Sequence, residues 1–113
     1  MTKIVNISPK AEKYFENLIV VLIKKEYFSY RENAEDYVLS ILNEIQNYID
    51  VLPHRNPKVS PLPRVKNLKY ITINKGKRTS WYIFFTVGKL NKSKFKIRHI
   101  SNNHSFPNIR GLK

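Results

Sequence analysis

Residues 97–104 read IRHISNNH and place one arginine, two histidines and two asparagines within eight positions. The stretch begins inside an apolar run of β type, so its polar groups belong near the end of a strand. Histidine, with an ordinary pKa of about 6.5, exchanges protons at neutral pH, and arginine binds phosphate oxygens. His99 and His104 are therefore candidates for proton transfer, and Arg98 is a candidate phosphate ligand.

These groups suffice for RNA cleavage without a metal, because the attacking 2′-hydroxyl already belongs to the substrate. One group takes its proton, a second protonates the leaving oxygen, and cations stabilise the charged phosphorane. Tyr82 is the candidate for stacking on a base. Structural readings stay open for each residue: His99 as a core histidine, His104 as an exposed tail histidine, and Tyr82 as a core aromatic.

Further side chains near these residues are candidates for binding RNA or an acidic protein segment. The alternatives are a charged strand edge that prevents aggregation, a solvated hairpin corner and a closing turn. The candidate binding residues are Lys77, Arg78, Lys94, Lys96, Asn103 and Arg110.

The charge of the chain is divided along its length. The net charge is +13, yet residues 1–50 hold all eight carboxylates against six Lys/Arg, and residues 51–113 hold fifteen Lys/Arg with no carboxylate. A surface built from the second part attracts phosphate backbones, acidic protein segments or anionic lipid in a salt-dependent way. A merely lysine-rich protein from an AT-rich genome is the alternative, and it does not explain the missing carboxylates.

Several classes of chemistry are excluded or disfavoured. The chain has no cysteine, so disulfides, thiolate nucleophiles and zinc–thiolate sites are ruled out. Its three glycines form no nucleotide-binding pattern, and its three histidines lack metal-ligand spacing. We expect no metal and no cofactor. The longest apolar stretch, residues 18–23, is too short to span a bilayer and no signal peptide is evident, so we expect a cytoplasmic protein without a membrane partner.

Two helices are predicted after a short strand at residues 3–7. Ser8 is a suitable N-cap and Pro9 suits the first turn of a helix ending near Phe28. In the second helix Asn33 is the predicted cap. Its predicted apolar face comprises Ala34, Tyr37, Val38, Ile41, Leu42, Ile45, Tyr48 and Ile49. A short polar turn would join them into an antiparallel hairpin.

The rest of the chain predicts a β-meander. A Pro-rich connection at residues 52–66 precedes strands at 68–74, 80–87 and 94–100, and residues 101–113 form a polar tail. The middle strand is apolar on both faces and should be central. In the last strand, alternation places His99 on the core face with Phe95 and Ile97, and Arg98 on a cationic outer face. The sequence thus predicts one α+β domain over residues 1–113, with the antiparallel meander packed on the hairpin.

This layout resembles the RelE/ParE superfamily of toxins from bacterial type II toxin–antitoxin systems. ISPKAEKYFENLI resembles the start of the family's first helix, and SWYIFFTV with FKIRHISNNH resembles its last two strands. IRHIS is similar to the Ile-Arg-His-Thr-Ser end of many ParE-like members. RelE-like nucleases often carry an arginine directly after an aromatic residue on the penultimate strand. Here Tyr82 follows Trp81, so Arg78 or Arg98 would have to substitute.

The resemblance implies a toxin that is silenced by a cognate acidic antitoxin whose extended segment wraps the basic surface. It implies one of two targets: mRNA at the ribosome for RelE-like members, or DNA gyrase for ParE-like members. The charge and the two late histidines favour a ribosome-dependent endoribonuclease without metal. A gyrase inhibitor without nuclease activity and a plain basic nucleic-acid-binding module remain alternatives.

Overall fold

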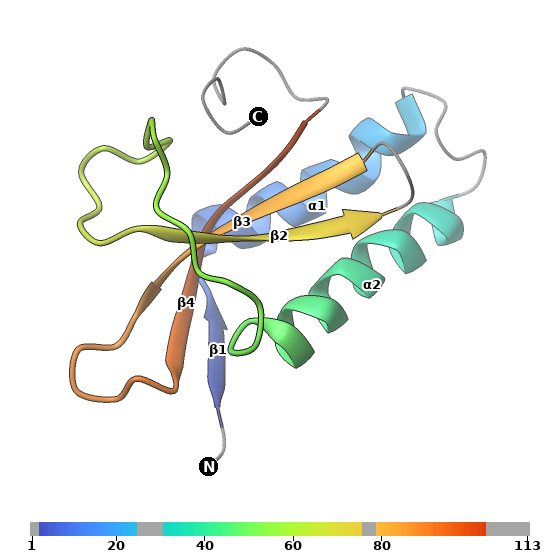
Figure 1. Ribbon diagram of the computed structural model, residues 1–113. Coiled ribbons are helices and arrows are strands. Elements are labelled where there is room, and N and C mark those ends of the chain that lie inside the picture. Colours follow the sequence, from blue (N-terminus) through green and yellow to red (C-terminus); the bar gives the residue numbers. More distant parts are fainter. Residues whose placement is uncertain (1–2, 25–30, 76–78, 104–113) are drawn as a thin grey trace.

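The computed structural model describes residues 3–24, 31–75 and 79–103 (Figure 1). In chain order its elements are β1 (Ile4–Ile7), α1 (Pro9–Lys24), α2 (Arg31–Tyr48), β2 (Lys69–Lys75), β3 (Thr79–Val87) and β4 (Lys94–Asn102). The predicted α+β class is confirmed. No helix within the described ranges is long and apolar enough to cross a membrane.

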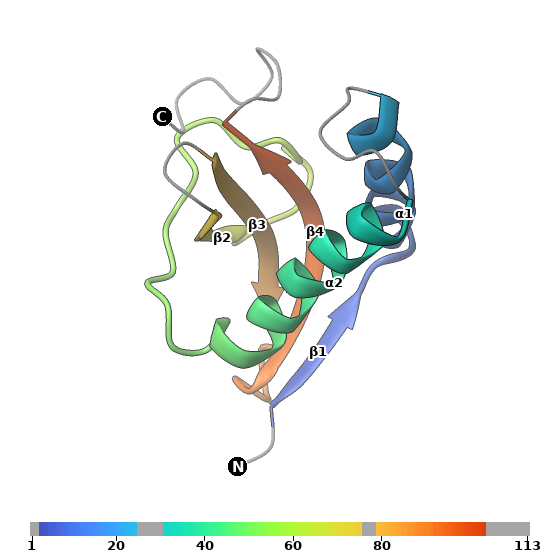
Figure 2. The same ribbon diagram turned by 90° about the vertical axis from the view of Figure 1, so that its right-hand side faces the viewer.

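The four strands form one mixed sheet in the order β1-β4-β3-β2. β2, β3 and β4 pair antiparallel, which confirms the predicted meander. β1 pairs parallel to β4, with Ile4 opposite Lys94 and Ile7 opposite Ile97. Both helices pack against the same side of the sheet (Figures 1 and 2). We call that side the inner face and the opposite side the outer face.

Helix α1 begins where the sequence predicts. The Oγ of Ser8 accepts a hydrogen bond of 3.2 Å from the backbone N–H of Ala11, and Pro9 is the first helical residue. The hydroxyl thus satisfies one of the unpaired N–H groups at the start of the helix. The predicted end near residue 28 lies outside the described residues.

Helix α2 begins at Arg31, so the prediction of Asn33 as its cap is wrong, and Asn33 lies exposed in the first turn. The acidic Glu32 in that turn suits the positive end of the helix dipole. The apolar residues recur every three or four positions and face the sheet. Those buried are Ala34, Val38, Ile41, Ile45 and Ile49.

The central position of β3 is confirmed by burial on both faces. Trp81, Ile83 and Phe85 join the core under the helices, whereas Tyr82 and Phe84 form a second apolar cluster on the outer face. Trp81 also donates a hydrogen bond of 2.9 Å from Nε1 to the hydroxyl of Tyr37, which ties β3 to α2.

The Pro-rich connection contains no helix or strand and crosses to the outer face. Arg55 exchanges two backbone hydrogen bonds of 2.9 Å with Tyr70, which covers part of the β2 edge. Leu62 and Val65 then pack against the outer apolar cluster. The outer face is therefore partly covered by a loop, and its open part lies toward β4.

Candidate functional site

A β-bulge in β4 determines which side chains reach the outer face. Phe84 and Phe85 are consecutive in β3, yet they pair with His99 and Ile97, so Arg98 is an extra residue in β4. A bulge of this kind bends the strand and redirects side chains. Beyond Ile97 the bulge therefore reverses which side chains of β4 point to the inner face and which point to the outer face.

The bulge overturns the predicted orientation of His99. Cross-strand partners share a face, and the partner of His99 is Phe84, a member of the outer cluster. Ile97 and Phe95 instead belong to the inner core. The prediction that His99 shares their face is therefore wrong.

His99 lies half-buried between two aromatic rings on the outer face. Its ring centroid is 5.6 Å from that of Phe84 and 6.0 Å from that of Tyr14 on α1. Burial, together with the positive charge of Lys10, lowers the pKa of His99 below its ordinary value. The imidazole is therefore neutral at pH 7 and can accept a proton. The hydroxyl of Ser101, two residues on, is buried on this side of the sheet and has no hydrogen-bond partner.

Arg98 reaches the same outer face as His99. Its Nε donates a hydrogen bond of 3.1 Å to Oγ1 of Thr86, which lies two positions from Phe84 along β3 and so shares its face. Lys96 is the register partner of Thr86 and is exposed, and Lys94 is exposed at the start of β4. The predicted cationic outer face of β4 is confirmed. Arg98 and His99, which strict alternation would separate, lie on one face.

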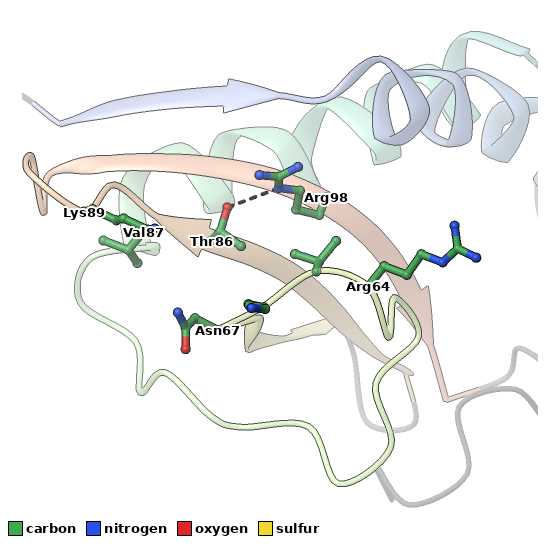
Figure 3. A pocket seen from close by; sticks show the side chains of 8 residues that line it. Arg64, Asn67, Thr86, Val87, Lys89 and Arg98 are labelled. Atoms are coloured by element: carbon green, nitrogen blue, oxygen red, sulfur yellow. Dashed lines mark hydrogen bonds between the residues drawn. The ribbon is translucent and has the colours of Figure 1, made fainter.

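A cationic pocket opens beside Arg98, where the Pro-rich connection meets the outer face (Figure 3). Its volume is about 370 Å³. Its lining residues come from the connection, from the end of β3 and the turn that follows, and from β4: Arg64, Val65, Lys66, Asn67, Thr86, Val87, Lys89 and Arg98. None of the described residues that line it is acidic.

Three of the four pocket cations were not predicted as site residues. Arg64 and Lys66 follow directly after Pro63 in the connection, and Lys89 follows Gly88 in the turn after β3. The absence of carboxylates from residues 51–113 was the available signal, but it does not single out any cation. Their convergence depends on the path of the connection across the sheet.

Asn67 holds the connection in a sharp bend at the pocket. Its φ is 59°, in the left-handed region where asparagine is tolerated better than most residues. The next residue, Leu68, is buried in the outer cluster. The bend thus anchors the segment that carries Arg64 and Lys66.

Tyr82 does not present its ring to solvent. The side chain is 7% exposed and packs edge-on against Tyr70, with centroids 6.0 Å apart. Burial, with a contribution from Tyr70, raises the pKa of its hydroxyl. Tyr82 is therefore packed as a core aromatic in this conformation, which was the structural alternative, and stacking on a base stays a prediction.

Asn103 closes the end of the β3–β4 ladder. Its Oδ1 accepts a hydrogen bond of 3.0 Å from the Ser80 N–H, and its own N–H donates to the Ser80 carbonyl at 3.2 Å. Asn103 thus has the structural role of closing the strand end, which was the alternative to binding that the sequence left open. The other predicted site residues, His104, Lys77, Arg78 and Arg110, lie outside the described residues.

A second pocket, of about 240 Å³, lies between the two helices and has the opposite character. It is mainly apolar, and its charged lining residues are Glu12 and Glu16. The charged groups that line this pocket are therefore acidic, whereas those of the pocket beside Arg98 are basic. Within residues 3–24, 31–75 and 79–103, no three His, Asp or Glu side chains gather in a metal-binding arrangement.

No protein-family model matches the chain, and neither the curated proteins nor the solved structures contain a match to it.

Proposed function

We propose that the protein is the toxin of a RelE/ParE-like toxin–antitoxin pair and that it cleaves mRNA on the ribosome without a metal. The observation that carries this proposal is the presence of Arg98 and His99 side by side on the outer face of β4. The order of elements, with a strand and a helical hairpin before an antiparallel meander, supports the resemblance noted in the sequence.

The proposed reaction uses His99 as the base. The neutral imidazole removes the proton of the ribose 2′-hydroxyl, and the oxygen attacks the adjacent phosphorus. Arg98 stabilises the added negative charge of the phosphorane. The P–O bond to the 5′-oxygen then breaks, which leaves a 2′,3′-cyclic phosphate, and the 5′-oxygen takes a proton. His104 is the proposed donor of that proton.

Arg98 also takes the role of the arginine that RelE-like nucleases carry after an aromatic residue. That position here is Tyr82, which is buried and cannot bind phosphate. Arg98 is on the outer face, and its guanidinium is held by Thr86. A fixed guanidinium loses little conformational freedom when it binds an oxyanion.

The test is a cell-free translation reaction with purified protein, in which message ends are mapped by primer extension. The wild type should cut the message only when ribosomes are present. His99→Ala should lower the rate about a hundredfold or more, because a positioned base contributes at least that much. The variant Lys13→Gln, at an exposed position of α1, should cleave normally and serves as the control. An intact message with wild-type protein, and unaffected growth on induction, would end the proposal.

A ParE-like gyrase inhibitor is the second candidate, and the burial of Tyr82 favours it because it leaves the outer face without its proposed stacking residue. A purified supercoiling assay separates the two activities. Loss of supercoiling with messages intact would establish gyrase as the target. Salt-sensitive binding to any nucleic acid, with neither activity, would indicate a simple binding module.

A further inference from the structure

We propose that the cationic pocket beside Arg98 binds a backbone phosphate of a single nucleic-acid strand, next to the phosphate held at His99. This inference rests on the proposed function, which places the nucleic-acid strand beside His99. It adds a second phosphate contact, outside the reacting centre. It implies that the substrate is a polymer and that a dinucleotide lacks part of its binding energy.

The charges of the pocket match a phosphate group. Arg64, Lys66, Lys89 and Arg98 reach it from three separate segments of the chain. None of the four makes an ion pair within the described ranges, whereas Lys3 and Lys75 are paired with carboxylates elsewhere. Four cations that line one pocket without a carboxylate create a positive potential there, and an anion lowers it.

The parts of the pocket are held in place before any ligand arrives. The Arg98 side chain, which lies between the pocket and the reacting centre, is held in place by the hydrogen bond from its Nε to Thr86. The segment with Arg64 and Lys66 is anchored by Val65, which lies between them, and by Leu68, both in the outer cluster. Pre-organised cations bind with a smaller loss of side-chain entropy.

The lining favours a sugar–phosphate backbone over a base or a peptide. No aromatic ring is among the described lining residues, so the pocket offers nothing for a base to stack on. A peptide that binds by adding a strand to a sheet needs a free strand edge. At Lys96, two residues before Arg98, β4 is paired on both sides, with β1 and with β3, so that mode is closed there. Charge-only recognition is typical of phosphate contacts, which carry no sequence information.

The experiment measures the salt dependence of binding to a fluorescent single-stranded deoxyoligonucleotide, between about 50 and 200 mM salt. This probe lacks the 2′-hydroxyl and cannot be cleaved by the proposed reaction. Arg64→Gln, Lys66→Gln and Lys89→Gln should each make the negative slope of log K against log salt shallower, by at most about 0.7, the value for one lost phosphate contact. Lys13→Gln removes the same charge from α1 and should leave the slope unchanged.

Equal effects of the pocket variants and Lys13→Gln would overturn the inference, because they would show a diffuse field rather than a site. Dependence on the pocket for an oligoglutamate peptide but not for the oligonucleotide would overturn it as well, in favour of an acidic protein partner. Because the probe is not cleaved, the pocket can pass this test while the nuclease proposal fails in the translation assay. If the wild type cleaves message in the translation assay but the pocket variants bind the probe as the wild type does, the nuclease proposal stands and the pocket inference fails.

Discussion

At the scale of single residues, the decisive feature is the environment of His99. Two rings, Phe84 and Tyr14, enclose the imidazole, and Lys10 adds a positive charge nearby. All of these disfavour the protonated form, so the pKa falls. The lowered pKa keeps the imidazole in its neutral form at pH 7, which is the form that the proposed role as base requires.

The lowered pKa of His99 predicts a pH-dependent stability. The unfolded chain takes up the proton at about pH 6.5, before the folded protein does, so the contribution of His99 is complete above that pH. It is lost as the pH falls through the lower pKa of the folded state. Urea unfolding followed by Trp81 fluorescence should show a wild type that loses more stability than His99→Gln between about pH 7.5 and 5. If the two proteins lose stability equally over this pH range, the folded state does not disfavour the protonated form of His99.

At the scale of elements, the hydrogen bond from Trp81 to Tyr37 is the clearest link between sheet and hairpin. Tyr37→Phe removes the acceptor and leaves a buried indole N–H without it. The free energy of unfolding should fall by about 1–3 kcal/mol, the usual penalty for a buried unsatisfied donor. The measurement is again urea unfolding.

Tyr48→Phe is the matched control for this prediction. Tyr48 is the last residue of the same helix and is 49% exposed, so losing its hydroxyl should change stability by less than about 0.5 kcal/mol. Equal losses in the two variants would show that the bond to Trp81 does not stabilise the docking of α2.

The elements themselves were predictable, because periodicity reports local burial. Apolar residues at three- and four-residue spacing predict α2, and an apolar run on both parities predicts a central β3. The bulge at Arg98 was not predictable, since neither glycine nor proline marks it and it arises from pairing across strands. The sequence did not predict the path of the Pro-rich connection across the outer face either. Its apolar residues indicated that part of it packs on the sheet, but not that Leu62 and Val65 do so while Val59 stays exposed.

At the scale of the whole molecule, the described carboxylates and the cations of the pocket lie on different parts of the surface. The described carboxylates lie on α1, on α2 or at Asp50 just after it, whereas the pocket cations lie on the outer face. Association with a polyanion should therefore be oriented as well as fast at low salt. Backbone amide shifts during titration with the deoxyoligonucleotide should change in β4, in Thr86 and Val87, and in residues 64–67.

The hairpin provides the internal reference for this mapping experiment. Amides near Glu12, Glu16 and Leu39 should stay unshifted at saturation, because they lie on exposed parts of the two helices. Shifts spread evenly over helices and sheet would contradict an oriented complex. Added salt should reverse the shifts of the outer face together, as expected of displaced counterions.

The parallel pairing of β1 with β4 joins Ile4 to Lys94 across nearly the whole described sequence. Closing so long a loop has a large entropic penalty, and only four residues of β1 repay it. Strand β1 cannot pair before the ribosome has synthesised β4, so the sheet is completed only after its last strand has been made. Maturation of the fold is consequently a late event in biosynthesis, and release of β1 is the expected first step when the molecule opens again.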